Sequence, residues 1–376
     1  LEMISFTITE KGYSVVDADL ERGLDPQFIM GKVTALMLKR FEAGAYPVTI
    51  QSMDNCSHNG DKLKNAVLAY ANAWVKAGIA EQGFVDYLND NSKVSYPWSM
   101  IDKITPRPDK LVQDMLAKDG FEDNYTIITE RNTYTAPFVN AEETEYLVME
   151  DDYTNGRPPL DKAGAIYAQR ETVDKVEKMK VCTCLNPLHT AMSIYGCMLG
   201  YTLISDEMKD EDIKGLITKM GYIEAMPVVV DPVVLKPADF IDAVLTRRLP
   251  NPFMPDAPQR IATDTSQKLS IRFGETIKAY IKNGLNMNDL VLIPLVLAGY
   301  ARYIKGIDDK GNDFTPSADP LLAELQEIVK PLEVKAGQQD MSCLKKLYAR
   351  EDVFGLNLCE TELIDRIIEM AAELYN

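Results

Sequence analysis

The chain begins with a strand pattern, a helix pattern and a second strand pattern. Of all its sequence features, this order constrains the fold most. Residues 4–9 (ISFTIT) and 47–53 (PVTIQSM) have the composition of strands, whereas residues 26–43 repeat apolar side chains at helical spacing. A second helix is predicted at 61–78. Strand–helix–strand order favours a parallel sheet with right-handed crossovers. Ligands of such sheets bind beyond the carboxyl ends of the strands, where Asn55 is expected to lie.

The remainder of the chain is predicted to be extended at first and then mostly helical. Residues 126–150 look extended, and Asn155–Pro159 (NGRPP) is a plausible domain boundary. Further helices are expected at residues 161–180, 187–204, 210–220, 237–248, 257–283, 289–304, 320–330, 342–350 and 360–375. We therefore predict an α/β plus all-α fold, with a partial Rossmann-like parallel-sheet domain at 1–155 and a mostly helical domain at 156–376.

Charge and cysteine usage exclude several classes of protein. The net charge of −17 and pI of about 4.7 argue against nucleic acid and anionic membranes as partners, because both require basic patches. No signal-peptide pattern is visible, and the apolar run at 290–300 is too short to span a bilayer. The six cysteines form no CxxC pair or His/Cys cluster, so no metal site is predicted. We expect a cytoplasmic monomer or weak homo-oligomer with a small-molecule partner.

Two polar segments far apart in the sequence are candidates for one pocket. Residues 54–60 (DNCSHNG) and 180–189 (KVCTCLNPLH) each contain asparagine and one of the only two histidines, His58 and His189. His189 is expected in the first turn of a helix, where the helix dipole favours the neutral imidazole. Each residue also has an alternative without a catalytic role: Asn186, followed by proline, could cap a helix, His189 could be a structural histidine, and Lys180 could be an exposed surface lysine.

A third group of charged residues has regular spacing. Arg260, Asp264 and Lys268 follow one another at intervals of four residues. The two basic side chains could clamp a substrate carboxylate, which an acidic protein would otherwise repel. On a continuous helix, however, the same spacing forms a surface ladder of ion pairs.

These segments, together with others, resemble the polyol-specific long-chain dehydrogenases, which form the mannitol dehydrogenase family. The matching stretches, in one order from residue 3 to about 270, are Thr9–Tyr13, Asp54-Asn55 with Asn59-Gly60, Ser99–Pro106, Pro137–Val139, Lys180 with Leu185-Asn186 and His189, and Asn251-Pro252 followed by Asp256, Arg260, Ile261, Asp264 and Lys268. The resemblance implies an expanded Rossmann domain followed by a largely helical domain, NAD or NADP as cofactor, and no metal.

The resemblance also implies a set of site residues. They are the catalytic residues Lys180, Asn55, Asn186 and His189; the substrate contacts Arg260, Lys268 and Asp102; Glu177 on a proton path; and Asn55 and Glu10 against the cofactor. Family members interconvert a secondary alcohol and a ketone on an open-chain polyol or sugar acid. For this chain we expect a hexuronate, with fructuronate and mannonate as the pair of reactants. The alternatives are the mannitol 2-dehydrogenase reaction on fructose and mannitol, or a non-catalytic truncated fragment unable to bind cofactor.

The expected chemistry suits these residue types. Without a metal, a basic side chain must take the proton of the reacting hydroxyl, and a lysine does so if burial and nearby cations bring its pKa towards neutrality. Two asparagine amides aimed at the oxygen would stabilise the negative charge that develops there.

Two features depart from the family pattern. Lys180 and Asn186 are six residues apart instead of the usual five, and Pro187 follows where glycine is frequent. The chain also contains neither a strand-linked GxGxxG nor a GxxxxGK[ST] sequence. The resemblance places the family's glycine-rich phosphate loop upstream of Leu1, so the first part of the sheet domain is expected to be missing.

Overall fold

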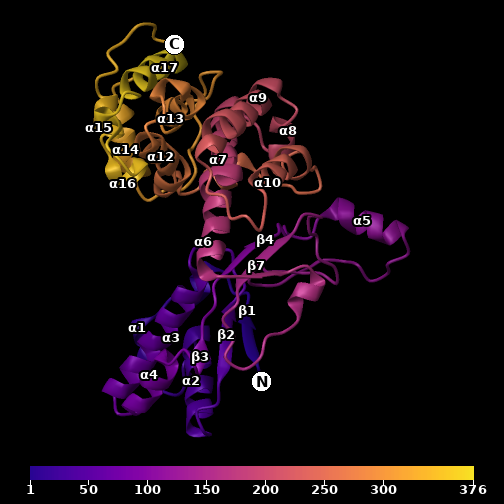
Figure 1. Cartoon of the computed structure of the whole chain (residues 1–376). Coiled ribbons are helices and arrows are strands. Elements are labelled where there is room, and N and C mark those ends of the chain that lie inside the picture. The colour runs from indigo at the N-terminus through magenta and orange to yellow at the C-terminus, as the bar shows by residue number, and fades with distance from the viewer. The chain divides into compact units, whose positions relative to one another are not determined.

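The structure, a computed structural model, describes all residues from Leu1 to Asn376 and contains two compact units (Figure 1). Unit 1 comprises Leu1–Lys103, Glu145–Glu177 and Pro232–Val234, and unit 2 comprises Ile104–Thr144, Lys178–Asp231 and Leu235–Asn376. The units interleave in sequence, and the division into domains at 1–155 and 156–376 stays a prediction.

Unit 1 contains the predicted parallel sheet. Its strands are β1 (Met3–Phe6), β2 (Val48–Ser52) and β3 (Val94–Ser95), in the order β1-β2-β3, with both neighbouring pairs parallel. Every residue of β2 is buried, as expected for a central parallel strand. The predicted strand at 4–9 ends earlier, at Phe6, because the chain then turns into the 3₁₀ segment η1 (Glu10–Tyr13).

Four helices accompany this sheet in unit 1. They are α1 (Asp17–Leu20), α2 (Ile29–Glu42), α3 (Asn59–Lys76) and α4 (Gln82–Asn89), the last three of which lie beside the strands in Figure 1. The predicted helices at 26–43 and 61–78 are thus confirmed. Their apolar faces form one core with β2, to which α3 contributes Val67, Tyr70 and Trp74. Because β2 and α3 are both held in this core, the position of the polar segment between them is fixed.

A second sheet in unit 1 corrects one prediction. It has the order β4-β7-β8, where β4 (Ser99–Asp102) runs antiparallel to β7 (Tyr146–Glu150) and β8 (Ile166–Ala168) runs parallel to β7. The helix predicted at 161–180 is therefore wrong in its first half. A 3₁₀ segment, η2 (Leu160–Ala163), ends at Gly164 with φ of 96°, β8 follows, and α6 spans only Arg170–Met179.

Unit 2 begins with a segment at 104–144. It contains α5 (Lys110–Lys118) and the antiparallel pair β5 (Ile127–Ile128) and β6 (Tyr134–Thr135). With β7, these short strands account for the extended structure that was predicted at 126–150.

The remainder of unit 2 is helical, as predicted, but the single helix predicted at 257–283 is wrong, because the chain is interrupted at residues 262–264. Its α-helices are α7 (Asn186–Leu199), α8 (Ile204–Glu207), α9 (Glu211–Lys219), α10 (Pro237–Ala243), α11 (Pro258–Ile261), α12 (Glu275–Asn283), α13 (Leu292–Tyr303), α14 (Leu322–Val329), α15 (Leu344–Tyr348), α16 (Glu351–Phe354) and α17 (Ile364–Tyr375). The apolar run at 290–300 forms most of α13, which is buried. None of the helices has both the length and the apolar character to cross a membrane.

Shorter helical turns interrupt these helices. Four are π turns with one extra residue per turn, namely η3 (Lys180–Cys184), η4 (Met220–Ala225), η6 (Val244–Arg248) and η8 (Ser270–Gly274). The 3₁₀ segments are η5 (Met226–Val228), η7 (Thr265–Gln267), η9 (Met287–Asp289) and η10 (Leu358–Glu360). Because π turns are frequent at functional sites, residues in these four turns are candidates for catalysis or binding.

Candidate active site

Lys180 is a buried lysine at the first position of a π turn. Only 3% of its surface is exposed, which excludes the alternative of an ordinary surface lysine. The turn η3 follows directly on α6, and the Leu185 N–H donates to the Lys180 carbonyl at 3.1 Å, five residues away. A π turn holds one residue more than an α turn. The π turn thus accounts for one extra residue between Lys180 and Asn186.

Asn186 is the first residue of α7 rather than its cap. The residue in the capping position is Leu185, which has no polar side chain, and Pro187 follows in the first turn. The Asn186 carbonyl accepts from the Thr190 hydroxyl at 3.0 Å, but its side-chain amide makes no hydrogen bond with the first turn. The structure therefore does not support a helix cap as the function of this side chain.

The imidazole of His189 lines a cavity of about 660 Å³ in unit 2. His189 lies in the first turn of α7, as predicted. The polar residues around the cavity include Arg248, Asp256 and Arg260, and one wall is formed by residues 104–109. A histidine, three arginines and two aspartates line this cavity, because its wall at 104–109 includes Arg107 and Asp109, and they provide the donors and the charge that recognition of a polar small molecule requires.

His189 is neutral at physiological pH. Burial lowers the pKa of its imidazole to about 4, and Arg272, Arg248 and Arg260 act in the same direction, while Asp256 opposes them. The neutral form was predicted from the helix dipole, but desolvation is the largest cause in the structure. A neutral imidazole can donate to or accept from a substrate hydroxyl.

A buried ion pair fixes one wall of this cavity. Arg248 and Glu142 form a bidentate pair with both nitrogen–oxygen distances at 2.9 Å, and each side chain is only 2% exposed. Glu142 also accepts from the Ile104 N–H at 2.7 Å, so it joins residues 104–109 to π turn η6. Sequence reasoning missed this pair, because nothing in a local pattern connects residues 106 positions apart.

The charged residues near 260 do not form a helical ladder. Arg260 pairs with Asp256 through two nitrogens instead of with Asp264, and its own side chain is 71% exposed. Asp264 has φ of 53°, so the helix is broken between Arg260 and Lys268. The Lys268 ammonium donates to the carbonyls of Ile261 and Thr263, and burial lowers its pKa. The alternative of a surface ion-pair ladder is thus wrong.

In unit 1, Asp54 ties together the loops that follow β1 and β2. Its buried carboxylate accepts from the backbone N–H groups of Ile8 and Thr9 at 2.7 to 3.0 Å and from the Tyr13 hydroxyl. Asn59 is also buried and donates to the carbonyls of Asp54 and Ser99. These contacts hold the segment 54–60 beyond the carboxyl end of the parallel sheet, where Asn55 is exposed. That position suits the dinucleotide of a Rossmann-type domain.

The other predicted site residues of unit 1 have identified surroundings. The carboxylate of Glu177 accepts from the Ser57 hydroxyl, and Glu10 forms an exposed ion pair with Lys62. Asp102 is buried as the last residue of β4. Asn55 belongs to unit 1 whereas Lys180 belongs to unit 2, so the shared pocket stays a prediction.

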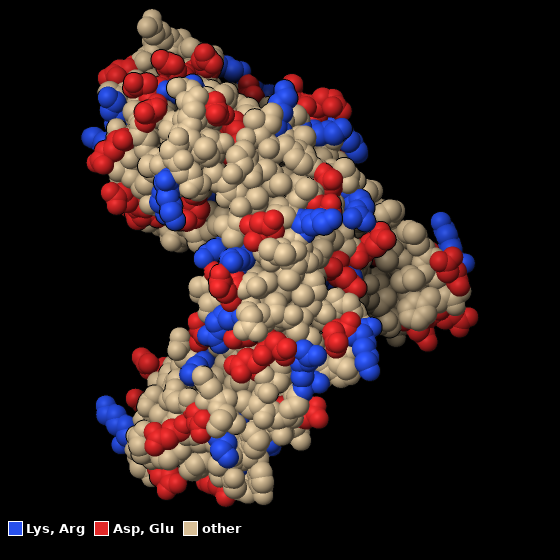
Figure 2. All heavy atoms as spheres, viewed as in Figure 1, with Lys and Arg blue, Asp and Glu red and all other residues tan.

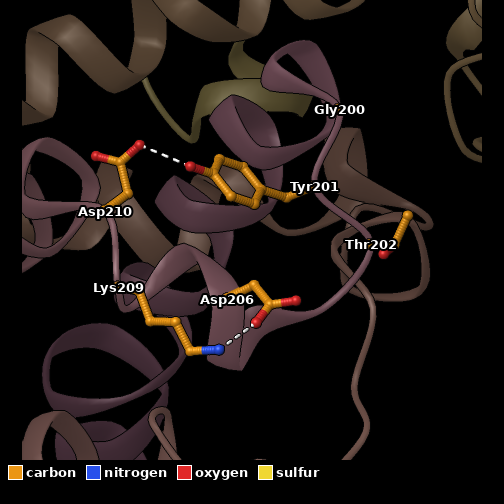
Figure 3. Close-up of a pocket in the computed structure, with 6 residues that line it drawn as sticks. All are labelled: Gly200, Tyr201, Thr202, Asp206, Lys209 and Asp210. Atoms are coloured by element: carbon orange, nitrogen blue, oxygen red, sulfur yellow. Dashed lines mark hydrogen bonds and ion pairs between the residues drawn. The ribbon is translucent and has the colours of Figure 1, made fainter.

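A second hollow lies at the other end of α7 (Figure 3). It is lined by residues 200–202, Asp206, Lys209 and Asp210. Its polar side chains pair with each other: the Tyr201 hydroxyl donates to Asp210 at 2.8 Å, and Lys209 pairs with Asp206 at 2.7 Å. The cavity at His189 is therefore the better candidate for substrate.

Comparison with known proteins identifies the family. Residues 2–162 match the mannitol dehydrogenase Rossmann domain, and residues 172–375 match the mannitol dehydrogenase C-terminal domain. The chain belongs to the mannitol dehydrogenase family. It is accordingly an oxidoreductase whose cofactor is NAD or NADP, and the predicted Rossmann-like domain followed by a helical domain is confirmed.

Individual relatives show how this similarity is distributed. The D-mannonate oxidoreductase of Thermotoga maritima is 46% identical over 98% of this chain and 71% of its own length. A D-sorbitol dehydrogenase in substrate-free form superposes with a TM-score of 0.76 at 23% identity, over 99% of this chain and 72% of its own. The mannitol 2-dehydrogenase of Pseudomonas fluorescens, solved with NAD and D-mannitol, has a TM-score of 0.67 at 24% identity, over 100% of this chain and 71% of its own.

Replacing Asn186 by aspartate separates a donor from a cap. We expect Asn186→Asp to leave the melting temperature nearly unchanged and to lower kcat by about 10²–10³-fold, because a carboxylate cannot donate to a developing oxyanion. The control is Asn286→Asp, since Asn286 caps a turn by accepting from the Asn288 N–H at 3.1 Å and its amide also donates to Asp289 at 3.1 Å; this variant should have a lower melting temperature but keep its kcat. Normal turnover in Asn186→Asp would show that this amide takes no part in the reaction.

Proposed function

We propose that the protein interconverts fructuronate and mannonate with a nicotinamide cofactor. The observation that carries this proposal is the group of basic side chains at His189 in a chain of net charge −17. Arg248, Arg260 and Arg272 all act on the His189 imidazole, and the carboxylates of Glu142 and Asp256 offset only the first two of these charges. On the face shown in Figure 2, basic and acidic side chains are interspersed. An anionic substrate would be favoured by such a local excess of positive charge.

Sequence similarity supports the acid over the neutral polyol. A D-mannonate oxidoreductase is 46% identical to this chain, whereas two mannitol 2-dehydrogenases are 32% and 30% identical. The mannitol–fructose reaction remains the alternative within the same family.

The site residues have distinct proposed tasks. When bound, the nicotinamide exchanges a hydride with the carbinol carbon of the substrate. Lys180 takes the hydroxyl proton, while the amides of Asn55 and Asn186 donate to the oxygen that is left. Glu177 passes the proton on from the lysine.

The remaining contacts position the substrate. We assign hydroxyl groups of the open chain to the neutral imidazole of His189 and to Arg260, Lys268 and Asp102. Asp256 already offsets the charge of Arg260, so a hydroxyl contact suits this arginine. Asn55 and Glu10 are assigned to the cofactor.

We further propose that the protein works in the cytoplasm as a monomer or weak homo-oligomer. None of the six cysteines forms a disulfide in the structure, which fits a reducing compartment.

A competition experiment tests the substrate. Equal concentrations of fructuronate and fructose are incubated with the protein and NADH, and the consumption of each is followed by NMR. We expect fructuronate to be consumed first, with kcat/KM higher by at least about tenfold, the value of one charge-assisted hydrogen bond. Faster consumption of fructose would move the mannitol dehydrogenase reaction to first place.

A further inference from the structure

We propose that Arg272 recognises the carboxylate of the substrate and so sets the preference for a sugar acid over a neutral polyol. The inference rests on the proposed function and names a residue of the same site. Arg272 lies in π turn η8, outside every motif that the sequence analysis singled out.

Among the arginines that act on His189, Arg272 alone has no carboxylate partner in unit 2. Arg248 is neutralised by Glu142, and Arg260 is neutralised by Asp256, each through a bidentate pair. The single side-chain hydrogen bond of Arg272 is donated by one terminal nitrogen to the Thr190 hydroxyl. The other guanidinium N–H groups retain their capacity to donate, and the charge is uncompensated.

The packing of η8 places this charge beside the candidate catalytic residues. The turn packs against η3, which begins with Lys180, and against α7, which carries His189. The Thr276 hydroxyl in α12, which directly follows η8, donates to the Cys182 carbonyl of η3 at 3.4 Å. The Arg272 backbone N–H donates to the Lys268 carbonyl at 3.0 Å, and burial and then the positive charge of Arg272 lower the pKa of Lys268. Arg272 thus lies among His189, Lys268 and the Lys180 turn.

Arg272 is half-buried, and the desolvation of its guanidinium points to an anionic ligand. Burial lowers the pKa of its guanidinium to about 10, and no acidic side chain offsets this effect. Buried charges in proteins are usually paired, because an unpaired charge loses hydration without compensation. A planar guanidinium with free N–H groups matches a carboxylate in geometry and in charge. A neutral polyol would leave this charge unpaired, and this difference is the basis of discrimination.

Three variants test the assignment. Arg272→Gln removes the charge but can still donate to Thr190. Arg272→Lys keeps the charge but lacks the planar guanidinium, which can donate two parallel hydrogen bonds to a carboxylate. Arg247→Gln is the control, because Arg247 is exposed on η6. For each, kcat/KM is measured with fructuronate and with fructose. The melting temperature is also measured with mannonate or mannitol added, which requires no turnover.

We expect Arg272→Gln to lower kcat/KM for fructuronate by about 10–100-fold, mainly through KM, and to change the value for fructose by less than about threefold. Mannonate should no longer raise the melting temperature of this variant. Arg272→Lys should recover part of the loss, and Arg247→Gln should behave as the wild type. If Arg272→Gln does not fold, Arg272→Lys decides the question alone, because the loss of the guanidinium group should still raise KM for fructuronate but not for fructose.

Two outcomes would overturn the inference. Equal losses on both substrates would make Arg272 a structural residue, and an unchanged preference for the acid would assign the carboxylate to another cation, with Arg260 the first to examine. Failure of the proposed function looks different, because the wild type itself would then show no preference for fructuronate over fructose.

Discussion

Lys180→Ala is expected to lower turnover by roughly 10²–10⁴-fold, the usual contribution of a general acid–base group. The lysine is buried at the start of π turn η3, so its replacement by alanine should remove the proposed base and leave the surface of the protein unchanged. Small primary amines should restore part of the rate by occupying the space that the side chain leaves.

The matched control for this prediction is Lys178→Ala. Lys178 lies two residues earlier on α6 and is exposed, so its replacement should leave kcat within about twofold if Lys180 is the base. Near-normal turnover in Lys180→Ala, with a loss in Lys178→Ala, would transfer the role to Lys178.

Glu207→Gln is expected to stabilise the protein at alkaline pH. Glu207 is fully buried at the end of α8 against Gly196 of α7, and neither carboxyl oxygen has a hydrogen-bond partner. Burial, with a smaller contribution from Asp210, raises the pKa of the carboxyl group to about 9. The folded protein therefore keeps a proton that the unfolded chain releases above its ordinary pKa of about 4.5.

The sign of the pH dependence follows from this difference. The contribution of Glu207 to stability is complete below about pH 4.5 and is lost as the pH rises towards 9. At pH 8 the glutamine variant should be more stable than the wild type by about 2–4 kcal/mol, and at pH 5 the two should differ little. Urea unfolding at both pH values measures this. The control Asp206→Asn changes a neighbouring carboxylate that is 42% exposed and should show no such trend. Equal stability of Glu207→Gln and wild type at pH 8 would mean that the carboxylate is solvated in the folded protein.

The sheet of unit 1 could be predicted because its signals are local. The alternation of strand and helix patterns around β2 and α3 follows from the burial of one face of each helix and of both faces of the central strand. The same logic placed Asn55 beyond the carboxyl end of β2. The helix predicted over 161–180 failed because Gly164 breaks the helix and residues 166–168 pair with β7, a partner that local periodicity cannot reveal.

The site was predictable in its residue types more than in its interactions. The segment 180–189 was singled out from its residue types, and His189 lies in the first turn of α7 as expected. A π turn has no sequence signature of its own, so the extra residue after Lys180 could not be placed beforehand. The pairing of Arg248 with Glu142 and the unpaired charge of Arg272 depend on tertiary neighbours, which no local pattern contains.

The central claim is that this protein is a cofactor-dependent dehydrogenase rather than a non-catalytic fragment, and a fluorescence titration with NADH tests it most directly. Wild type and Lys180→Ala are titrated in parallel, and mannonate turnover with NAD is measured on the same samples. We predict that both proteins perturb the nicotinamide fluorescence with a similar Kd, because the lysine acts on the substrate proton, and that only the wild type turns over mannonate at a normal rate. The absence of any spectral change with the wild type at saturating NADH would contradict this account.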